Sequence, residues 1–274
     1  MRRGVRGAQL TLIALAALGG RGAAAQEDFR SADLDRPILV EDAIPAKLYE
    51  WEFEIGIRGG PAEVGSGAIG IVELKSGLFL NGQTGIELEA GAGEAGEAGT
   101  LSGIRSVRGH LLYGFLRETG SWPAVAARLD LSTPGTGSLG LEEWALGVKG
   151  MATRSFGRTR SHLNAGYVVA SGTDGGDFWR TGIAFDHPIG LFSKAVMGDV
   201  YAEIPVSHGR TRVWLEFGTR WQLGNNDVLD FGLATRLDQW DAGNANVQFV
   251  LGISRLFGIS AFVPVSDYPN PSLR

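Results

Sequence analysis

The chain has 274 residues, a formal charge of −5 and 42 glycines, but no cysteine. The missing cysteines exclude a disulfide scaffold, a thiolate metal site and a cysteine nucleophile. With 44 % hydrophobic and 20 % charged residues, the chain is too apolar to be disordered, and its acidic balance argues against nucleic acid as a partner.

The first 25 residues have the three parts of a secretory signal peptide. Arg2, Arg3 and Arg6 supply the basic start, residues 10–18 form a short apolar run, and residues 23–25 are alanines suited to cleavage. The apolar run is shorter than the ~18 residues that a spanning helix needs. We expect cleavage after Ala25, which removes four arginines and no acids and takes the formal charge from −5 to −9.

Residues 26–46 form an acidic segment that contains Pro37 and Pro45 and precedes the first predicted strand. Two interpretations remain open. The segment folds into a barrel lumen as a plug whose charges meet lumenal arginines, or it forms a periplasmic arm.

Residues 48–58 alternate apolar and charged side chains, with Trp51, Phe53 and Ile55 between Glu50, Glu52 and Glu54. Successive side chains of a strand face opposite sides, so this period of two gives one apolar and one charged face. The same period recurs at residues 86–90, 107–115, 125–131, 144–148, 163–169, 179–185, 200–204, 213–221, 229–237 and 247–257. Residues 65–80 hold a further strand of ambiguous phase, which brings the predicted number to twelve.

The connections between these strands alternate in length. Longer, glycine-rich connections lie at 91–100, 132–140, 171–176 and 239–245, and the others are mostly tight, with 188–194 as an exception. Outer-membrane barrels show this asymmetry. The sequence therefore predicts an all-β fold: a closed, antiparallel, up-and-down transmembrane β-barrel of about 12 strands over residues 47–257, followed by a tail at 258–274. A soluble sandwich or lipocalin-like barrel is the alternative.

Aromatic residues gather toward the ends of the apolar faces, where a membrane barrel carries its interfacial girdles. We expect seven to lie at the lipid interface: Tyr49, Trp51, Tyr113, Trp122, Trp144, Trp179 and Trp221.

The opposite faces carry charges that a barrel would enclose. The candidates for lining the lumen are Glu50, Glu52, Glu54, Arg108, His110, Arg128, Asp130, Glu203, Arg212, Glu216, Arg220 and Arg236. Enclosed charges are costly unless they are paired, so a network that rigidifies the wall is one interpretation. A lining that selects solutes by size and charge is the other, and both can hold together.

No motif for catalysis, a metal or a cofactor emerges. Two Gly-x-Gly-x-x-Gly matches, at 65–70 and 91–96, lack the strand–loop–helix unit that a dinucleotide site requires. Ser161 and His162 are adjacent, so on a strand they point to opposite faces and do not form a lipase pair. We expect no enzyme activity, no metal and no cofactor.

Several motifs resemble one outer-membrane family. They are Asp35-Arg36-Pro37 followed by Glu41-Asp42-Ala43, the turn at 133–137, the strand at 162–167 and the strand at 180–184. In their order and spacing these segments resemble the family described as related to the meta-cleavage pathway of phenol degradation. The resemblance implies a twelve-stranded outer-membrane barrel that passes small hydrophobic or aromatic compounds.

The predicted function is a passive channel or transporter for small solutes, monomeric or weakly oligomeric, in outer-membrane lipid and inserted by the barrel-assembly machinery. A structural or surface-interaction barrel with a closed lumen is the first alternative. A soluble periplasmic ligand-binding barrel is the second.

Overall fold

The computed structural model describes residues 37–62, 65–94, 99–171, 176–190, 193–238 and 247–258. The expected signal peptide and the tail after residue 258 lie outside the described residues. Within the described ranges, no helix is long and apolar enough to cross a membrane.

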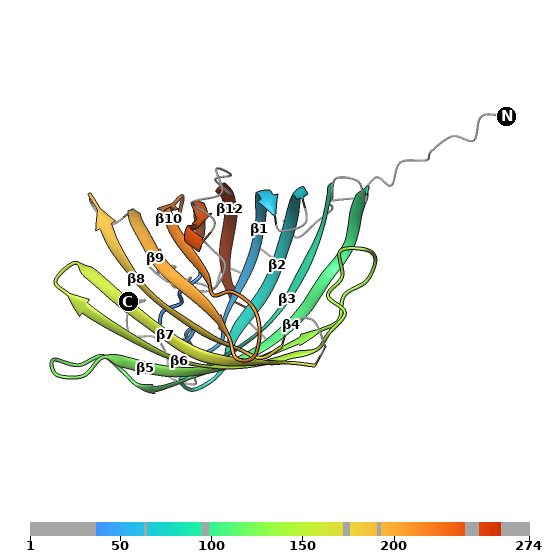
Figure 1. Cartoon of the computed structure of the whole chain (residues 1–274). Helices are drawn as coiled ribbons and strands as arrows, with labels where there is room; N and C mark the ends of the chain where they lie inside the picture. Colours follow the sequence, from blue (N-terminus) through green and yellow to red (C-terminus); the bar gives the residue numbers. More distant parts are fainter. Residues whose placement is uncertain are drawn as a thin grey trace.

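Twelve antiparallel strands form one closed sheet (Figure 1). Each strand pairs with the next in sequence, and β1 closes the circle by pairing with β12. The strands are β1 (Glu50–Ala62), β2 (Gly65–Phe79), β3 (Gly82–Glu94), β4 (Thr100–Leu116), β5 (Ala124–Thr133), β6 (Ala145–Phe156), β7 (Thr159–Ala170), β8 (Phe178–Ile189), β9 (Lys194–Pro205), β10 (Arg212–Gln222), β11 (Asp227–Arg236) and β12 (Val247–Gly258). The prediction of a closed, up-and-down, twelve-stranded barrel is confirmed.

The two ends of the barrel differ in their connections. The end where β1 begins and β12 finishes, here the short-turn end, carries the connections 80–81, 117–123, 157–158, 190–193 and 223–226. The opposite, long-loop end carries the two-residue connection 63–64 and the longer connections 95–99, 134–144, 171–177, 206–211 and 237–246. The exception predicted at 188–194 is wrong, because Pro188 and Ile189 still pair with Ala195 and Lys194 and leave only four residues between β8 and β9.

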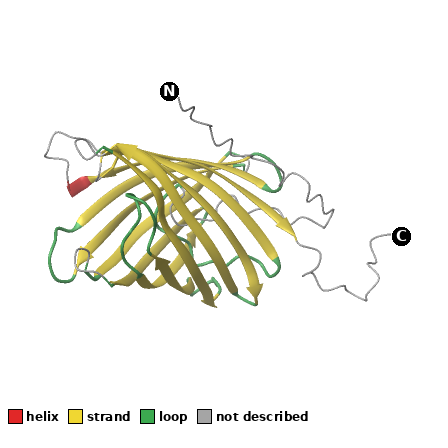
Figure 2. Cartoon of the chain, turned by 90° about the vertical axis from the view of Figure 1, so that its right-hand side faces the viewer, coloured by secondary structure: helices red, strands yellow, loops and turns green. Residues whose placement is uncertain are grey.

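The outer face of the barrel is apolar on every strand. Large hydrophobic side chains from all twelve strands are exposed, as Val148 is at 55 %, whereas its neighbour Lys149 is 6 % exposed on the inner face. Exposed apolar surface of this extent is unfavourable in water and matches a lipid environment. The strands run at a steep tilt to the barrel axis, as closure of a barrel requires (Figure 2). The fold is a transmembrane β-barrel.

The phase of β2 is fixed by its pairing with both neighbours. Glu73 and Lys75 lie opposite Glu54 and Glu52 of β1, and both are buried inside the barrel. Ile71 points inward as well and is 2 % exposed. The sequence left this phase ambiguous because apolar residues occupy both faces of the strand.

Candidate functional site in the barrel lumen

Residues 37–46, here called the lumenal segment, lie inside the barrel. Ile38 and Val40 are 1 % and 0 % exposed. The backbone N–H groups of Leu39 and Val40 both donate to Oδ2 of Asp199 on β9, each at 2.9 Å. A carboxylate that accepts two buried N–H groups satisfies donors that have no strand partner.

Glu41 connects the lumenal segment to three strands. Its carboxylate pairs with Lys149 of β6, Nζ to Oε2 2.6 Å, and with Arg128 of β5. Its backbone N–H donates to Oδ1 of Asn164 on β7 at 3.0 Å, and Nδ2 of Asn164 donates to the Glu41 carbonyl at 2.8 Å. Arg128 also donates to Asp130 at 2.8 Å. All polar groups of Glu41 therefore have partners on the inner wall.

A chain of hydrogen bonds continues from Ala43 into the wall. The Ala43 N–H donates to Oγ1 of Thr153 at 2.9 Å, Oγ1 lies 3.0 Å from Nδ1 of His162, and Nε2 of His162 lies 2.9 Å from Asp186. Arg160 donates to the same Asp186 carboxylate at 2.7 Å. Threonine, histidine and aspartate in this order are the groups of a hydrolase triad, but all three are at most 1 % exposed. The arrangement holds the lumenal segment and offers no surface to a substrate.

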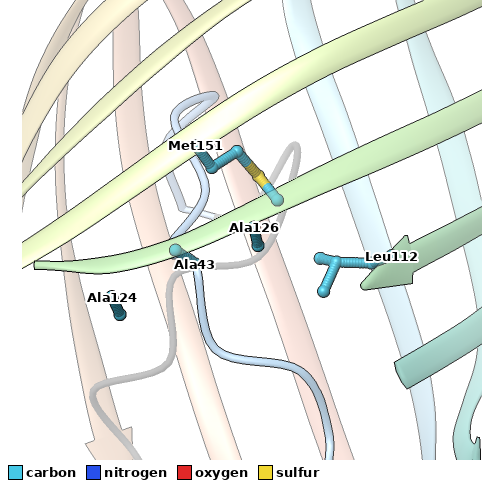
Figure 3. Close-up of a cluster of buried hydrophobic side chains, with 5 residues drawn as sticks. All are labelled: Ala43, Leu112, Ala124, Ala126 and Met151. Carbon is cyan, nitrogen blue, oxygen red and sulfur yellow. The ribbon is translucent and has the colours of Figure 1, made fainter. Parts of the chain in front are cut away.

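Apolar contacts complete the seat of the segment. Ile38 and Val40 pack against the inward-facing Ala184 and Met197. Figure 3 shows the second cluster, in which Ala43 lies against wall residues of β4, β5 and β6: Leu112, Ala124, Ala126 and Met151. The segment therefore covers apolar parts of the inner wall as well as the polar groups described above.

Inward-facing glycines leave room for the segment. A Cβ atom at Gly182 would lie 2.5 Å from Cγ2 of Val40, and one at Gly218 would lie 2.6 Å from Cβ of Pro37. Both distances are shorter than carbon atoms tolerate, so these positions need glycine for the close approach.

The wall from β1 to β4 is held by acids and bases of its own. Lys75 lies 3.1 Å from Glu52 and also pairs with Glu54. Glu73 lies 3.4 Å from Nδ1 of His110. Further toward the long-loop end, Arg108 lies 3.3 Å from Glu87. The Lys75 and Arg108 pairs join neighbouring strands, and pairing of this kind stiffens a closed wall.

The structure places the twelve predicted lumen-lining residues on inward-facing positions of the strands. All are buried or half-buried except Arg212, which is 48 % exposed at the long-loop end. Arg220 makes a fully buried pair with Asp230, with Nε at 2.6 Å from Oδ1. Glu216 lies opposite Asp199 in the register of β10 and β9.

The predicted interfacial aromatics divide between the two ends. Trp51, Tyr113, Trp122 and Trp221 lie toward the short-turn end, and Trp144 and Trp179 toward the long-loop end. Tyr49 differs from its prediction as a strand residue. It precedes β1 in a turn, at φ 64°, and is half-buried.

Sequence reasoning missed several lumenal groups. Glu73 and Lys75 were not predicted because the phase of β2 was ambiguous. Arg160 and Asp186 were not predicted because they lie beyond the expected strand ends. Trp214 was overlooked as an inward residue, although it lies two positions from both Arg212 and Glu216 and so shares their face.

Two carboxyl groups outside the spanning strands have shifted pKa values. Burial raises the pKa of Asp238, but hydrogen bonds from Arg236 and from the Val213 N–H, together with the Arg236 charge, outweigh it and lower the pKa below its usual value. Burial likewise raises the pKa of Glu118 at the short-turn end, and two hydrogen bonds from Ser155 outweigh it and lower the pKa. Both groups are therefore ionised at neutral pH.

Comparison with known proteins identifies the fold. No family model matches the sequence, and no curated protein matches it significantly. Among solved structures, the COG4313 outer membrane channel from Pseudomonas putida F1 is similar at a TM-score of 0.63 and 13 % identity, over 79 % of this chain and 98 % of that one. The KdgM porin (TM-score 0.52, 9 % identity, 75 % and 99 % covered) and the NanC porin (0.51, 10 %, 75 % and 98 %) are similar as well. At these identities the likeness concerns the fold.

Proposed function

We propose that the protein is a passive channel for small solutes in the outer membrane, and that the lumenal segment restricts its bore. The observation that carries this proposal is a charged inner wall crossed by a segment that is held by side chains of the wall and not by strand pairing. Ten residues without a strand partner are easier to displace than any part of the sheet, whose backbone bonds are all made between strands.

The similar folds support this proposal. Solved structures described as an outer membrane channel and as porins share the barrel, and the aromatic residues at both ends suit lipid interfaces. A cleaved signal peptide, insertion by the barrel-assembly machinery and a monomeric or weakly oligomeric state belong to the same proposal. The solute class of small hydrophobic or aromatic compounds rests on the resemblance to the phenol meta-pathway family.

A barrel with a permanently closed lumen is the second candidate. It is favoured by the number of buried contacts that hold the segment, above all the pairing of Glu41 with Arg128 and Lys149. The two candidates differ in whether residues 37–46 can be displaced from their position in the lumen.

A reversible crosslink distinguishes them. The 2.9 Å hydrogen bond from the Ala43 N–H to Oγ1 of Thr153 keeps the two Cα atoms within ~7 Å by standard bond lengths, close to the reach of a disulfide. Because the native chain has no cysteine, Ala43→Cys/Thr153→Cys introduces a single possible pair.

We expect planar bilayers with the reduced double variant to show discrete single-channel currents, and oxidation to suppress them reversibly. The single variants Ala43→Cys and Thr153→Cys, treated with the same oxidant, are the matched controls and should keep their currents. Absence of current from the wild type and from the reduced variant would support the closed barrel instead.

A further inference from the structure

The half of the lumen nearest the long-loop end holds a group of arginines. Strand direction and contacts place there the residues that we call the mouth arginines: Arg58, Arg105, Arg108, Arg180, Arg212 and Arg236. Carboxylates pair with members of this group: Glu87, Glu89 and Glu203 from the strands and Asp238 from the loop after β11. In this half of the lumen, guanidinium groups and carboxylates of neighbouring strands therefore lie side by side.

Two of the mouth arginines are more accessible to water than Arg128 beneath the segment. The Arg180 and Arg212 side chains are 30 % and 48 % exposed, whereas Arg128, which holds the lumenal segment, is 4 % exposed. Arg180 and Arg212 also share one carboxylate, with Glu203 oxygens 2.9 Å and 3.6 Å away. Two guanidinium groups therefore meet at one carboxylate near the mouth.

The strand register arranges these groups in two neighbouring rows on β8 to β11. The first row is Arg180, Glu203 and Arg212, which are directly opposite one another on β8, β9 and β10. The second is Tyr201, Trp214 and Arg236 on β9, β10 and β11. Rows of this kind are held by the sheet itself and need no loop to position them.

Aromatic rings lie against the guanidinium groups of this patch. The Arg180 guanidinium carbon is 5.4 Å from the Phe178 ring centroid and 5.5 Å from that of Tyr201, and the Arg236 guanidinium is 5.5 Å from the Trp214 ring. Such contacts fix the planar forks while the rings offer apolar surface beside them. We define the mouth patch as Phe178, Arg180, Tyr201, Arg212, Trp214 and Arg236.

We propose that the mouth patch is a binding site for organic anions that combine a carboxylate with an aromatic ring. A guanidinium fork matches a carboxylate with two parallel hydrogen bonds, and a ring beside it stacks or packs on the Trp214 and Phe178 side chains. This inference deepens the channel function proposed above and rests on it for its physiological meaning, since it names the solute that the mouth admits.

Binding is tested apart from conduction. Saturation-transfer NMR on the full mature protein in detergent compares benzoate with benzamide, a neutral molecule of the same shape. We expect transfer to benzoate to exceed that to benzamide about threefold or more, and to be lost in Arg180→Gln/Arg212→Gln/Arg236→Gln. Arg212→Gln alone, at the most exposed of the three side chains, should reduce it without endangering the fold.

The matched control is Arg255→Gln. This residue is 66 % exposed and pairs with Asp227 near the short-turn end, so its loss removes the same charge far from the patch and should leave the benzoate signal intact. Equal transfer to benzoate and benzamide, or an unchanged benzoate signal in both the triple and the Arg212→Gln variants, would overturn the proposal.

Conduction is measured separately in planar bilayers with asymmetric KCl. Preference for chloride over potassium, falling about threefold or more in the triple variant, supports the proposal; preference for potassium overturns it. Benzoate binding without any current would support the anion site and contradict only the channel function.

Discussion

Oε2 of Glu41 lies 2.6 Å from Nζ of Lys149, so a carboxylate of the lumenal segment meets an ammonium group of the barrel wall. The two side chains are 4 % and 8 % exposed, and Arg128 pairs with the same carboxylate. Removing one member of a buried ion pair leaves an uncompensated charge and costs ~3–5 kcal/mol. Glu41 is therefore the residue on which the position of the lumenal segment depends most.

We predict that Glu41→Gln increases the conductance or the open probability of the channel. The substitution leaves two buried cations, Arg128 and Lys149, facing a neutral amide, and displacement of residues 37–46 lets water reach them. Single-channel recording measures the effect. Glu142→Gln, which removes the same charge from an exposed position in a loop, should behave as the wild type, and identical currents for both variants would contradict the prediction.

A second prediction concerns the hydroxyl of Thr153. Thr153→Val removes the acceptor of the Ala43 N–H, and an unsatisfied buried donor costs ~1–3 kcal/mol. Hydrogen–deuterium exchange of the Ala43 amide should become faster by the corresponding factor. Thr219→Val also removes a hydroxyl, one that donates to the Ala195 carbonyl, and should leave Ala43 exchange unchanged.

The barrel was predictable because alternation with a period of two indicates that the two faces of a strand meet different surroundings. On β1, Trp51 and Phe53 alternate with Glu52 and Glu54, and this contrast holds whether the inner face meets water, a segment or other charges. On β2 the contrast fails, because Ile71 points inward and Val72 outward. Strand existence thus follows from local pattern, whereas phase requires the pairing with neighbours.

The lumenal segment was not predictable in the same way. Residues 37–46 have no period, and their contacts join residues far apart in the sequence: Leu39 and Asp199 are separated by 160 positions. The sequence showed only the acidic charge and the lumenal cations, which suit a plug and a free arm equally. Trp214 was not predicted as a lumenal residue, although its spacing from Arg212 and Glu216 places it on their face.

The glycine content gives a third prediction. Gly182→Ala would place a Cβ atom 2.5 Å from Cγ2 of Val40, whereas Gly147→Ala, also on the inner face, would meet nothing closer than 3.6 Å. Overpacking of this kind costs ~1–3 kcal/mol, so Gly182→Ala should loosen the segment and Gly147→Ala should not. Maleimide labelling of Ala43→Cys in both backgrounds measures the difference, and equal labelling rates would show that Val40 moves aside without disturbing the segment.

The last prediction concerns pH. Asp238 sits beside Arg236, with Oδ2 2.6 Å from Nη2, and hydrogen bonds and charge from this arginine, acting against burial, keep the pKa of Asp238 below the usual 3.8. A lowered pKa means that the carboxylate stays ionised as pH falls through the ordinary range and is protonated only below it. Its negative charge then offsets Arg236 at neutral pH, and protonation makes the mouth more positive.

Asp238→Asn should therefore raise the chloride-to-potassium permeability ratio at pH 7. The gap from the wild type should close only when the pH falls below 3.8, because the wild-type side chain is then neutral as well. Reversal potentials over a pH series measure both effects. Asp227→Asn, near the short-turn end beside Arg255, removes the same charge away from the mouth and should leave the ratio unchanged; a gap between Asp238→Asn and the wild type that closes already near pH 5 would contradict the assigned direction of the pKa shift.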